Sequence, residues 1–422
     1  MTVGQHEDPY RWLILALSTL SNAVLVAAPS MALAVLFNEI QRDLQLTLVE
    51  VGLIWSIGSL PGIFLSLLGG ALGDRFGAKR MYLVIAVLAG SLGIARGFAQ
   101  NFAQLIVLNS LIGGVSMLGT INSYKACGTW FPRRQLGLAN SLLAMGMAGG
   151  FLIGSLISAT WLSPWLGGWR NVLILYGVLG GLFAVPWLLT RAAPSFAGPP
   201  GTASAQARAA STSLPTAVPM RESLAAVVRL RAVWMLGLVL LGLSGCVQGL
   251  LGYLPLYLRG VGWDPAAADG ALALFHTVSL IFALPIALSS DRLGTRNRVL
   301  WVALASMAAG VGAVAFVTGV GVWIAIVAAG MVRDGFMSIY MTAVVEVEGV
   351  GARYVGTATG FAMVLGSLGS LFGPPIGNSL AAISPNAPFL FWAFLAVAAM
   401  AALAFVPEVR RPLTTPAVAE PI

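Results

Sequence analysis

The chain contains twelve mostly apolar stretches, each about 20 residues long or longer. A helix needs about 20 apolar residues to cross the hydrocarbon core of a bilayer, so each stretch predicts one transmembrane helix. Only 9% of the 422 residues are charged and mean hydropathy is +0.89, whereas a soluble protein carries about a quarter charged residues. The expected spans are 11–37, 48–72, 80–99, 103–127, 137–161, 171–190, 232–258, 266–289, 299–318, 321–345, 355–380 and 387–407. The pattern predicts an all-α membrane protein of twelve helices.

The stretch between the sixth and seventh spans divides the chain. Residues 192–219 are rich in Ala, Pro, Ser, Thr and Gly and have no helical apolar pattern, which is typical of a linker. We therefore expect a six-helix bundle over 1–191, a cytoplasmic linker over 192–231, a second six-helix bundle over 232–407 and a cytoplasmic tail over 408–422.

The basic residues lie mainly on one side of the expected spans. With the N-terminus inside, 17 Lys and Arg fall on the cytoplasmic side, and four (Arg42, Arg96, Arg170 and Arg259) fall on the other. The positive-inside rule then predicts that both termini are cytoplasmic. The span starting at residue 11 is too long for a signal peptide, so we expect it to be retained. The expected location is the cytoplasmic (inner) membrane.

A short charged loop occurs twice, at one constant offset. Residues 70–80 read Gly-Ala-Leu-Gly-Asp-Arg-Phe-Gly-Ala-Lys-Arg, and a weaker copy begins 217 positions later. The copies align Asp74 with Asp291, Arg75 with Arg292, and Gly77 with Gly294. A loop repeated once in each half indicates two copies of one membrane unit.

This loop resembles the signature loop of the major facilitator superfamily of secondary transporters. The resemblance implies two pseudo-symmetric six-helix bundles and an alternating-access mechanism. It also implies a gating role for Asp74, Arg75, Gly77, Asp291 and Arg292. In the superfamily each Asp lies near the start of a helix of the other bundle, where free N–H groups favour an anion.

The second-half arginine is also expected to have a carboxylate partner. The resemblance pairs Arg292 with an acid at the end of span ten, where Glu346 is suitably placed. The first half departs from the pattern, because span four ends without a carboxylate for Arg75. The alternative is that these loop charges only fix the topology.

Arg333 and Asp334 lie within the span expected over 321–345. A central Arg costs about 2.5–3.5 kcal/mol to insert, so it must face protein, water or a ligand. In the superfamily this span lines the central cavity, so we expect Arg333 to bind an anionic substrate, with Tyr340 on the same face. Neighbouring residues point about 100° apart on a helix, so we do not expect Arg333 and Asp334 to pair. Asp334 is the expected proton carrier; the alternative is a structural role for both.

Two other spans carry ionisable candidates. Lys125, five residues before Trp130-Phe131-Pro132, resembles a cation of the superfamily's organic-anion symporters, and Asn122 shares its helix face. His276 lies in the middle of span eight and can bind substrate or relay a proton. The alternatives are a Lys125 that reaches the headgroups and a buried structural His276.

Weaker polar candidates complete the expected cavity. Asn22 on span one, and Gln248 and Tyr257 on span seven, are placed to contact substrate. Arg96, near the outer end of span three, is expected to extend its side chain to the membrane surface.

These features favour a proton-coupled secondary transporter of a small anion, with a carboxylate such as a monocarboxylate ranked above nitrate; symport, antiport and facilitated diffusion all stay open. The expected partners are an anionic substrate, protons and the bilayer, and the expected state is a monomer. We expect no enzymatic activity, cofactor, metal or nucleic acid, because no motif for them occurs. A proton-driven multidrug exporter and a transport-inactive sensor of the same fold are the alternatives.

Overall fold

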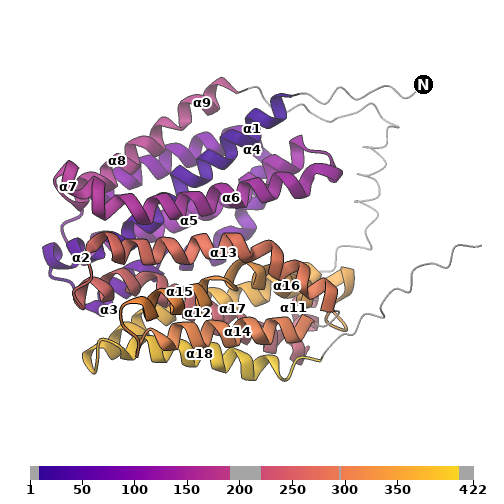
Figure 1. Ribbon diagram of the computed structural model, residues 1–422. Helices are drawn as coiled ribbons and strands as arrows, with labels where there is room; N and C mark the ends of the chain where they lie inside the picture. The colour runs from indigo at the N-terminus through magenta and orange to yellow at the C-terminus, as the bar shows by residue number, and fades with distance from the viewer. Residues whose placement is uncertain (1–8, 191–219, 294–295, 408–422) are drawn as a thin grey trace, which may run out of the picture. The chain divides into compact units, whose positions relative to one another are not determined.

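The computed structural model describes residues 9–190, 220–293 and 296–407, and within these ranges every regular element is a helix. Within these ranges the structure describes the backbone but not the side chains of residues 66–75, 133–134, 220–221, 284, 287–293 and 351–353. The chain divides into two compact units (Figure 1). The first comprises residues 1–223 and 251–273, and the second comprises 224–250 and 274–422.

The helices of the first unit cover the expected spans. They are α1 (Tyr10–Ser21), η1 (Asn22–Ala27), α2 (Ala28–Leu44), α3 (Leu48–Ser56), α4 (Ser59–Gly97), α5 (Phe102–Trp130), α6 (Arg133–Ile157), η2 (Ser158–Leu162), α7 (Ser163–Leu166), α8 (Trp169–Leu182) and α9 (Ala184–Leu189). However, the loop expected between spans two and three is helical, because α4 runs through it with one kink at Gly77. Capping residues in the sequence determine where some of these helices begin. Thr47 and Glu50, for example, form a reciprocal capping box that starts α3.

Two elements of the first unit are π-helices, and each precedes a proline. η1 precedes Pro29 and η2 precedes Pro164. A proline ring removes one N–H donor and clashes with the carbonyl four residues earlier, which here belongs to Leu25 and to Thr160. Widening the helix by one residue relieves that clash, and such widenings are frequent at functional sites.

The second unit and the shared helices complete the chain. They are α11 (Met220–Val228), α12 (Arg231–Gly260), α13 (Pro265–Leu293), α14 (Arg296–Ala313), α15 (Val320–Gly330), α16 (Arg333–Val345), α17 (Gly351–Ser379), η3 (Leu380–Ala382) and α18 (Ala387–Leu403). α12 changes unit after Leu250, and α13 changes unit after Ala273. Pro255 lies inside α12 and cannot donate to the carbonyl of Leu251, so the helix is weakened next to that boundary.

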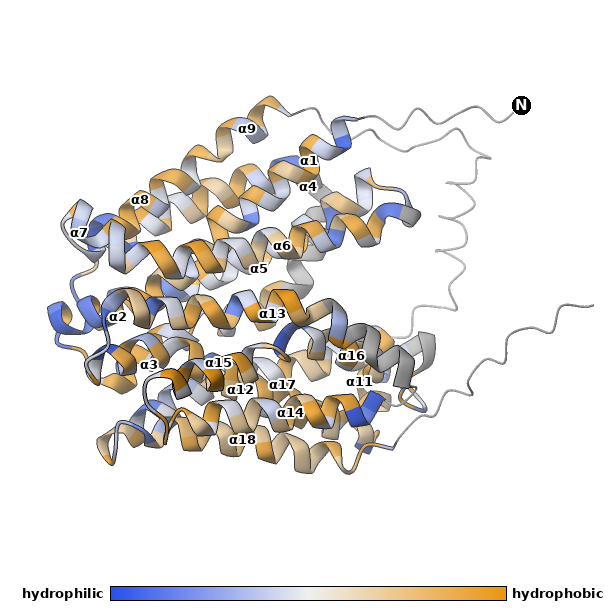
Figure 2. Cartoon of the chain, viewed as in Figure 1, coloured by the Kyte–Doolittle hydropathy of each residue, from blue (hydrophilic) through white to orange (hydrophobic). Residues whose placement is uncertain are grey.

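Ten described helical segments are long and apolar enough to cross a membrane, and α18 is a shorter apolar helix. Apolar residues run along the helices and polar residues gather at their ends (Figure 2). The expected span 299–318 corresponds to α14, whose first turn carries Arg296, Asn297 and Arg298 and is therefore less apolar. The helices agree with the predicted all-α membrane fold.

Close helix packing depends on small residues, as is usual in membranes. A Cβ atom on Gly177 of α8 would lie 2.4 Å from the backbone nitrogen of Ile94 in α4. In the second unit, a Cβ atom on Gly369 of α17 would lie 2.0 Å from the carbonyl oxygen of Leu241 in α12. Any larger residue at these positions would push the helices apart.

Candidate functional site

The candidate site lies in the second unit, where the tenth expected span is broken. α15 ends at Gly330, Met331 and Val332 form a turn, and α16 begins at Arg333. Gly330 lets this turn approach α13 closely, because a Cβ atom there would lie 2.7 Å from the carbonyl oxygen of Phe275. The break places two charged side chains in the first turn of a new helix.

Arg333 and Asp334 pair with each other, contrary to the expectation from continuous helical geometry. Arg333 Nη1 donates to Asp334 Oδ1 at 2.8 Å, and the side chains are 30% and 35% exposed. The pair forms because Arg333 starts a helix and has a side chain long enough to reach its neighbour. Asp334 also lies at the positive end of the α16 dipole, which favours a carboxylate there.

α13 contributes two polar residues to this region. The backbone N–H of Asp334 donates to Ser279 Oγ at 3.2 Å. His276, one turn before Ser279, is buried, lies edge-on to Phe275 and is close enough to Arg333 to interact electrostatically. The structure thus brings together Arg333, Asp334 and His276, three of the predicted residues, and adds Ser279.

Two further predicted residues of the second unit have other surroundings. Tyr340 is fully buried, lies 5.7 Å from the Phe336 ring and donates to the carbonyl oxygen of Leu236 at 2.8 Å. Its hydroxyl therefore ties α16 to α12 in this conformation, instead of lying on the exposed face with Arg333. Gln248 is half-buried on α12.

The remaining substrate candidates lie in the first unit. Asn22 is buried and accepts a hydrogen bond from Ser123 Oγ at 2.8 Å, and Ser123 also bonds the Tyr82 hydroxyl. Asn122 is buried and donates to the carbonyl oxygen of Leu118 at 2.8 Å. Its Oδ1 is buried without a partner among the described residues. Lys125 is half-buried one turn further along α5.

Tyr257 belongs to the first unit, on the part of α12 that follows Leu250. It is 9% exposed, and its ring centroid lies 6.0 Å from that of Tyr253. Gln248 and Tyr257 share one helix but lie in different units.

The repeated loop is described in part. Gly77 interrupts α4 with φ 76° and ψ 158°, a conformation that residues with a Cβ atom rarely adopt. Lys79, two residues later, donates to the carbonyl oxygens of Leu188 and Thr190 at the end of α9. The side chains of Asp74, Arg75, Asp291 and Arg292 lie outside the described residues, so their gating roles stay predictions.

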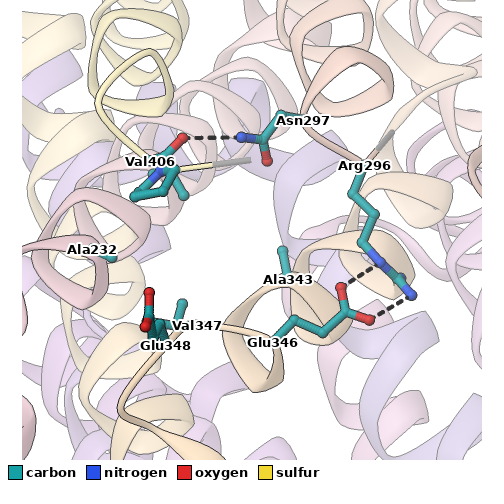
Figure 3. Close-up of a pocket in the computed structure, with 9 residues that line it drawn as sticks. Ala232, Arg296, Asn297, Ala343, Glu346, Val347, Glu348 and Val406 are labelled. Carbon is teal, nitrogen blue, oxygen red and sulfur yellow. Dashed lines mark hydrogen bonds and ion pairs between the residues drawn. The ribbon is translucent and has the colours of Figure 1, made fainter. Parts of the chain in front are cut away.

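Glu346, at the end of α16, has a described partner other than the one expected. Arg296 Nε lies 2.7 Å from Glu346 Oε2, and Arg296 Nη2 donates to Oε1 at 3.0 Å. Both residues line a cavity of about 520 Å³ in the second unit, together with Asn297, which donates to the carbonyl oxygen of Val406 (Figure 3). The motif pointed to Arg292, and the structure shows the same type of pair with the arginine four residues later.

Some polar residues were missed or misjudged from sequence. Arg96 is buried and donates to Asn109 Oδ1 at 3.1 Å, so the expectation that it reaches the membrane surface is wrong. Asn109 in turn donates to the carbonyl oxygen of Ile54, close to the break between α3 and α4. Asp269 is buried against Arg259. The only sequence signal for that pair is their position on either side of one short interhelical loop.

These helices and their buried charges define a polytopic membrane protein of the transporter type. The chain matches the Major Facilitator Superfamily over residues 15–371, and it belongs to that family. The resemblance seen in the repeated loop is thereby confirmed.

Similar proteins include several transporters of anions. The chain is 28% identical to a gallate transporter of Pseudomonas putida, covering 98% of this chain and 95% of the relative. It is 26% identical to a probable nitrate/nitrite antiporter, NarK1, of Thermus thermophilus, covering 70% of this chain and 65% of the relative. A match at 32% identity to a hexuronate transporter of Bacillus subtilis covers only 37% of this chain and 36% of the relative.

Solved structures show the same fold. A bacterial homologue of the human lysosomal transporter Spinster, inward-facing and unoccupied, matches with a TM-score of 0.73 at 16% identity, covering 94% of this chain and 95% of the other. The nucleoside transporter NupG matches with a TM-score of 0.71 at 14% identity, covering 93% and 99%. Both confirm the predicted all-α major facilitator fold.

Proposed function

We propose that this protein is a secondary transporter that moves a small organic anion, a carboxylate, across the cytoplasmic membrane by alternating access with proton coupling. The observation that carries the proposal is the partly exposed guanidinium of Arg333 at a helix break within an apolar span. An arginine at that depth is costly to insert, and Asp334 occupies only one of its donor nitrogens, so the rest of the partly exposed guanidinium can receive a second negative charge.

The geometry of Arg333 suits a carboxylate. Its described hydrogen bond uses Nη1, and within the described residues Nε and Nη2 have no acceptor. A guanidinium presents its donors as a flat fork that can bind both oxygens of a carboxylate at once. The relatives named for gallate and hexuronate support the same substrate class. Because the match to the gallate transporter spans nearly all of both chains, we favour a hydroxylated aromatic carboxylate.

Asp334 can couple the transport of the anion to the movement of a proton. As an ionised partner it competes with a substrate carboxylate for the Arg333 guanidinium. A proton on Asp334 removes that competition, so proton and anion bind together and the net charge of the loaded site is unchanged. We therefore retain Asp334 as the coupling residue, and we propose that buried His276 supports the orientation of Arg333.

Lys125 and Asn122 of the first unit stay predicted substrate contacts. Asn122 offers an amide whose Oδ1 has no partner among the described residues. We also propose that Asp74 and Asp291 act at the cytoplasmic gates. In this scheme the Gly77 kink orients the first of the two loops.

Uptake by proteoliposomes tests this proposal. Purified protein is reconstituted with an inward proton gradient and offered radiolabelled gallate, a hexuronate, nitrate and a hydrophobic cationic dye, each at matched concentration. Saturable accumulation of gallate or the hexuronate that collapses with a protonophore supports the proposal. Transport of the dye alone, or binding without flux of any anion, contradicts it.

A further inference from the structure

A second Arg–Asp pair lies in the first unit, and it is far more buried than the one at Arg333. Arg259 Nη2 contacts both oxygens of Asp269, at 2.6 and 2.7 Å. The side chains are 11% and 0% exposed. Thr160 on η2 donates to Asp269 Oδ2 at 2.7 Å. One carboxylate therefore joins the end of α12, the start of α13 and η2.

A second carboxylate faces this cluster. Glu39 on α2 is close enough to Asp269 to act on it electrostatically, and Ser163 donates to Glu39 Oε2 at 2.6 Å. The nearby charges are exposed Arg42 and the ion pair between Asp43 and Arg170. Asp269 therefore has one cation, Arg259, in direct contact and a second carboxylate, Glu39, nearby.

Two of the helical segments that meet at this cluster are locally distorted or weakened by a proline, so they can move. η2 is a π-helix caused by Pro164, and it places Thr160 within reach of Asp269. Residues 251–273 begin with the turn of α12 that Pro255 weakens. The same segment packs closely on α3, since a Cβ atom on Gly252 would lie 2.4 Å from the Trp55 indole. The cluster therefore lies where a helix hairpin meets the rest of the first unit.

We propose that Asp269 is a proton-operated latch on the side of the protein that is expected to face outward. While Asp269 is ionised, it holds residues 251–273 against η2 through Thr160 and keeps Arg259 compensated. When Asp269 takes up a proton, the ion pair with Arg259 is lost, Thr160 bonds a neutral carboxyl group, and the hairpin separates from η2. The latch is closed at high pH and opens as the pH falls. The only bond formed is the O–H bond of the protonated carboxyl group.

This inference assumes the alternating-access cycle of the proposed function, but it is independent of the substrate. Its test is therefore made without substrate. Spin labels are attached to cysteines introduced at Trp161 on η2, which is 72% exposed, and at Val261 in the α12–α13 loop, which is 50% exposed. Both native cysteines are buried. Pulsed electron–electron double resonance then measures the distance between the two spin labels at pH 8 and pH 5.5.

The expected result is one short distance at pH 8 and a growing longer-distance population at pH 5.5. The ratio of long to short should rise about tenfold, which is the factor that one hydrogen bond to a charged group is worth. Asp269→Asn should show the longer distance at both pH values. Asp264→Asn is the matched control, because exposed Asp264 only accepts from the N–H groups of Ala266 and Ala267 and should respond to pH like the parent protein.

Two outcomes would overturn the proposal. One is a distance distribution that does not change with pH in the parent protein. The other is a pH response that Glu39→Gln removes and Asp269→Asn leaves intact.

If Asp269→Asn does not fold, Thr160→Val decides the question, since it keeps the ion pair and removes one bond of the latch. It should raise the longer-distance population at pH 8, and an unchanged distribution would contradict the latch. Gallate uptake by the Thr160→Val protein separates a failure of the latch from a failure of the transport proposal.

Discussion

The two Arg–Asp pairs of this protein use the same chemical groups in opposite surroundings. Arg333 and Asp334 are about one-third exposed and adjacent in sequence, whereas Arg259 and Asp269 are almost completely enclosed and belong to two helices. The exposed pair can exchange its internal bond for a ligand at little cost. The enclosed pair cannot lose one member without leaving a buried charge. Exposure, more than residue type, therefore separates the proposed binding site from the proposed latch.

The largest effect is expected at the exposed pair. Arg333→Ala should abolish anion uptake, because Arg333 is the only Lys or Arg among the residues described for the second-unit site, while Arg333→Lys keeps the charge and should retain uptake with a higher apparent KM. Initial rates in proteoliposomes at matched protein content measure both. If Arg333→Ala takes up the anion at the wild-type rate, the exposed pair does not bind the anion and the two pairs do not differ in this function.

The loss of stability, in contrast, should be larger when the enclosed pair is broken than when the exposed pair is broken. Asp269→Ala leaves Arg259 buried without its partner and should lower the free energy of unfolding by about 3 kcal/mol. Asp334→Ala breaks a partly exposed pair and should cost about 1 kcal/mol or less. Thermal unfolding in one detergent compares the two variants directly. A larger loss for Asp334→Ala would mean that the exposed pair is the structural one.

Coupling is the next test of the exposed pair. Asp334→Asn cannot carry a proton, so it should lose gradient-driven accumulation and retain exchange of labelled for unlabelled anion across the membrane. Uptake and counterflow are measured in the same vesicles. If accumulation survives in Asp334→Asn, the coupling proton resides elsewhere, and Asp269 becomes the first group to examine.

A small effect is expected at Tyr340, which lies on the same helix as Arg333 but is buried. Tyr340→Phe removes only the bond to the carbonyl oxygen of Leu236 and should lower stability by about 1 kcal/mol. The apparent KM for the anion should not change. A large rise in KM would show that the hydroxyl leaves Leu236 and contacts substrate during transport.

Much of the fold was predictable, because it depends on local patterns. The length and hydropathy of the apolar stretches located the helices, and the repeated loop around Asp74 and Asp291 pointed to the family. The Gly77 kink follows from a residue type that alone adopts that backbone conformation. These features need no knowledge of which helices touch.

The site was predictable only in part, because its details depend on breaks and packing. Mid-span Arg333 stood out by its insertion cost, but the end of α15 at Gly330 is a tertiary effect of close packing on α13. That break is what lets Arg333 reach Asp334. Arg96 was placed near a membrane boundary by its position along the chain, and Asp269 was not singled out. Their burial depends on neighbours that are far away in sequence, such as Asn109 and Thr160.

Equilibrium binding shows whether the exposed Arg333–Asp334 pair is the anion site. Purified wild-type, Arg333→Ala and Arg259→Lys proteins are titrated calorimetrically with gallate and with a hexuronate at pH 6, and near-ultraviolet circular dichroism confirms that each variant is folded. An anion that binds the wild type should lose at least about tenfold in affinity in Arg333→Ala, which is the value of one charge-assisted bond. Arg259→Lys should bind it as the wild type does. Equal affinity for wild type and Arg333→Ala would contradict the account.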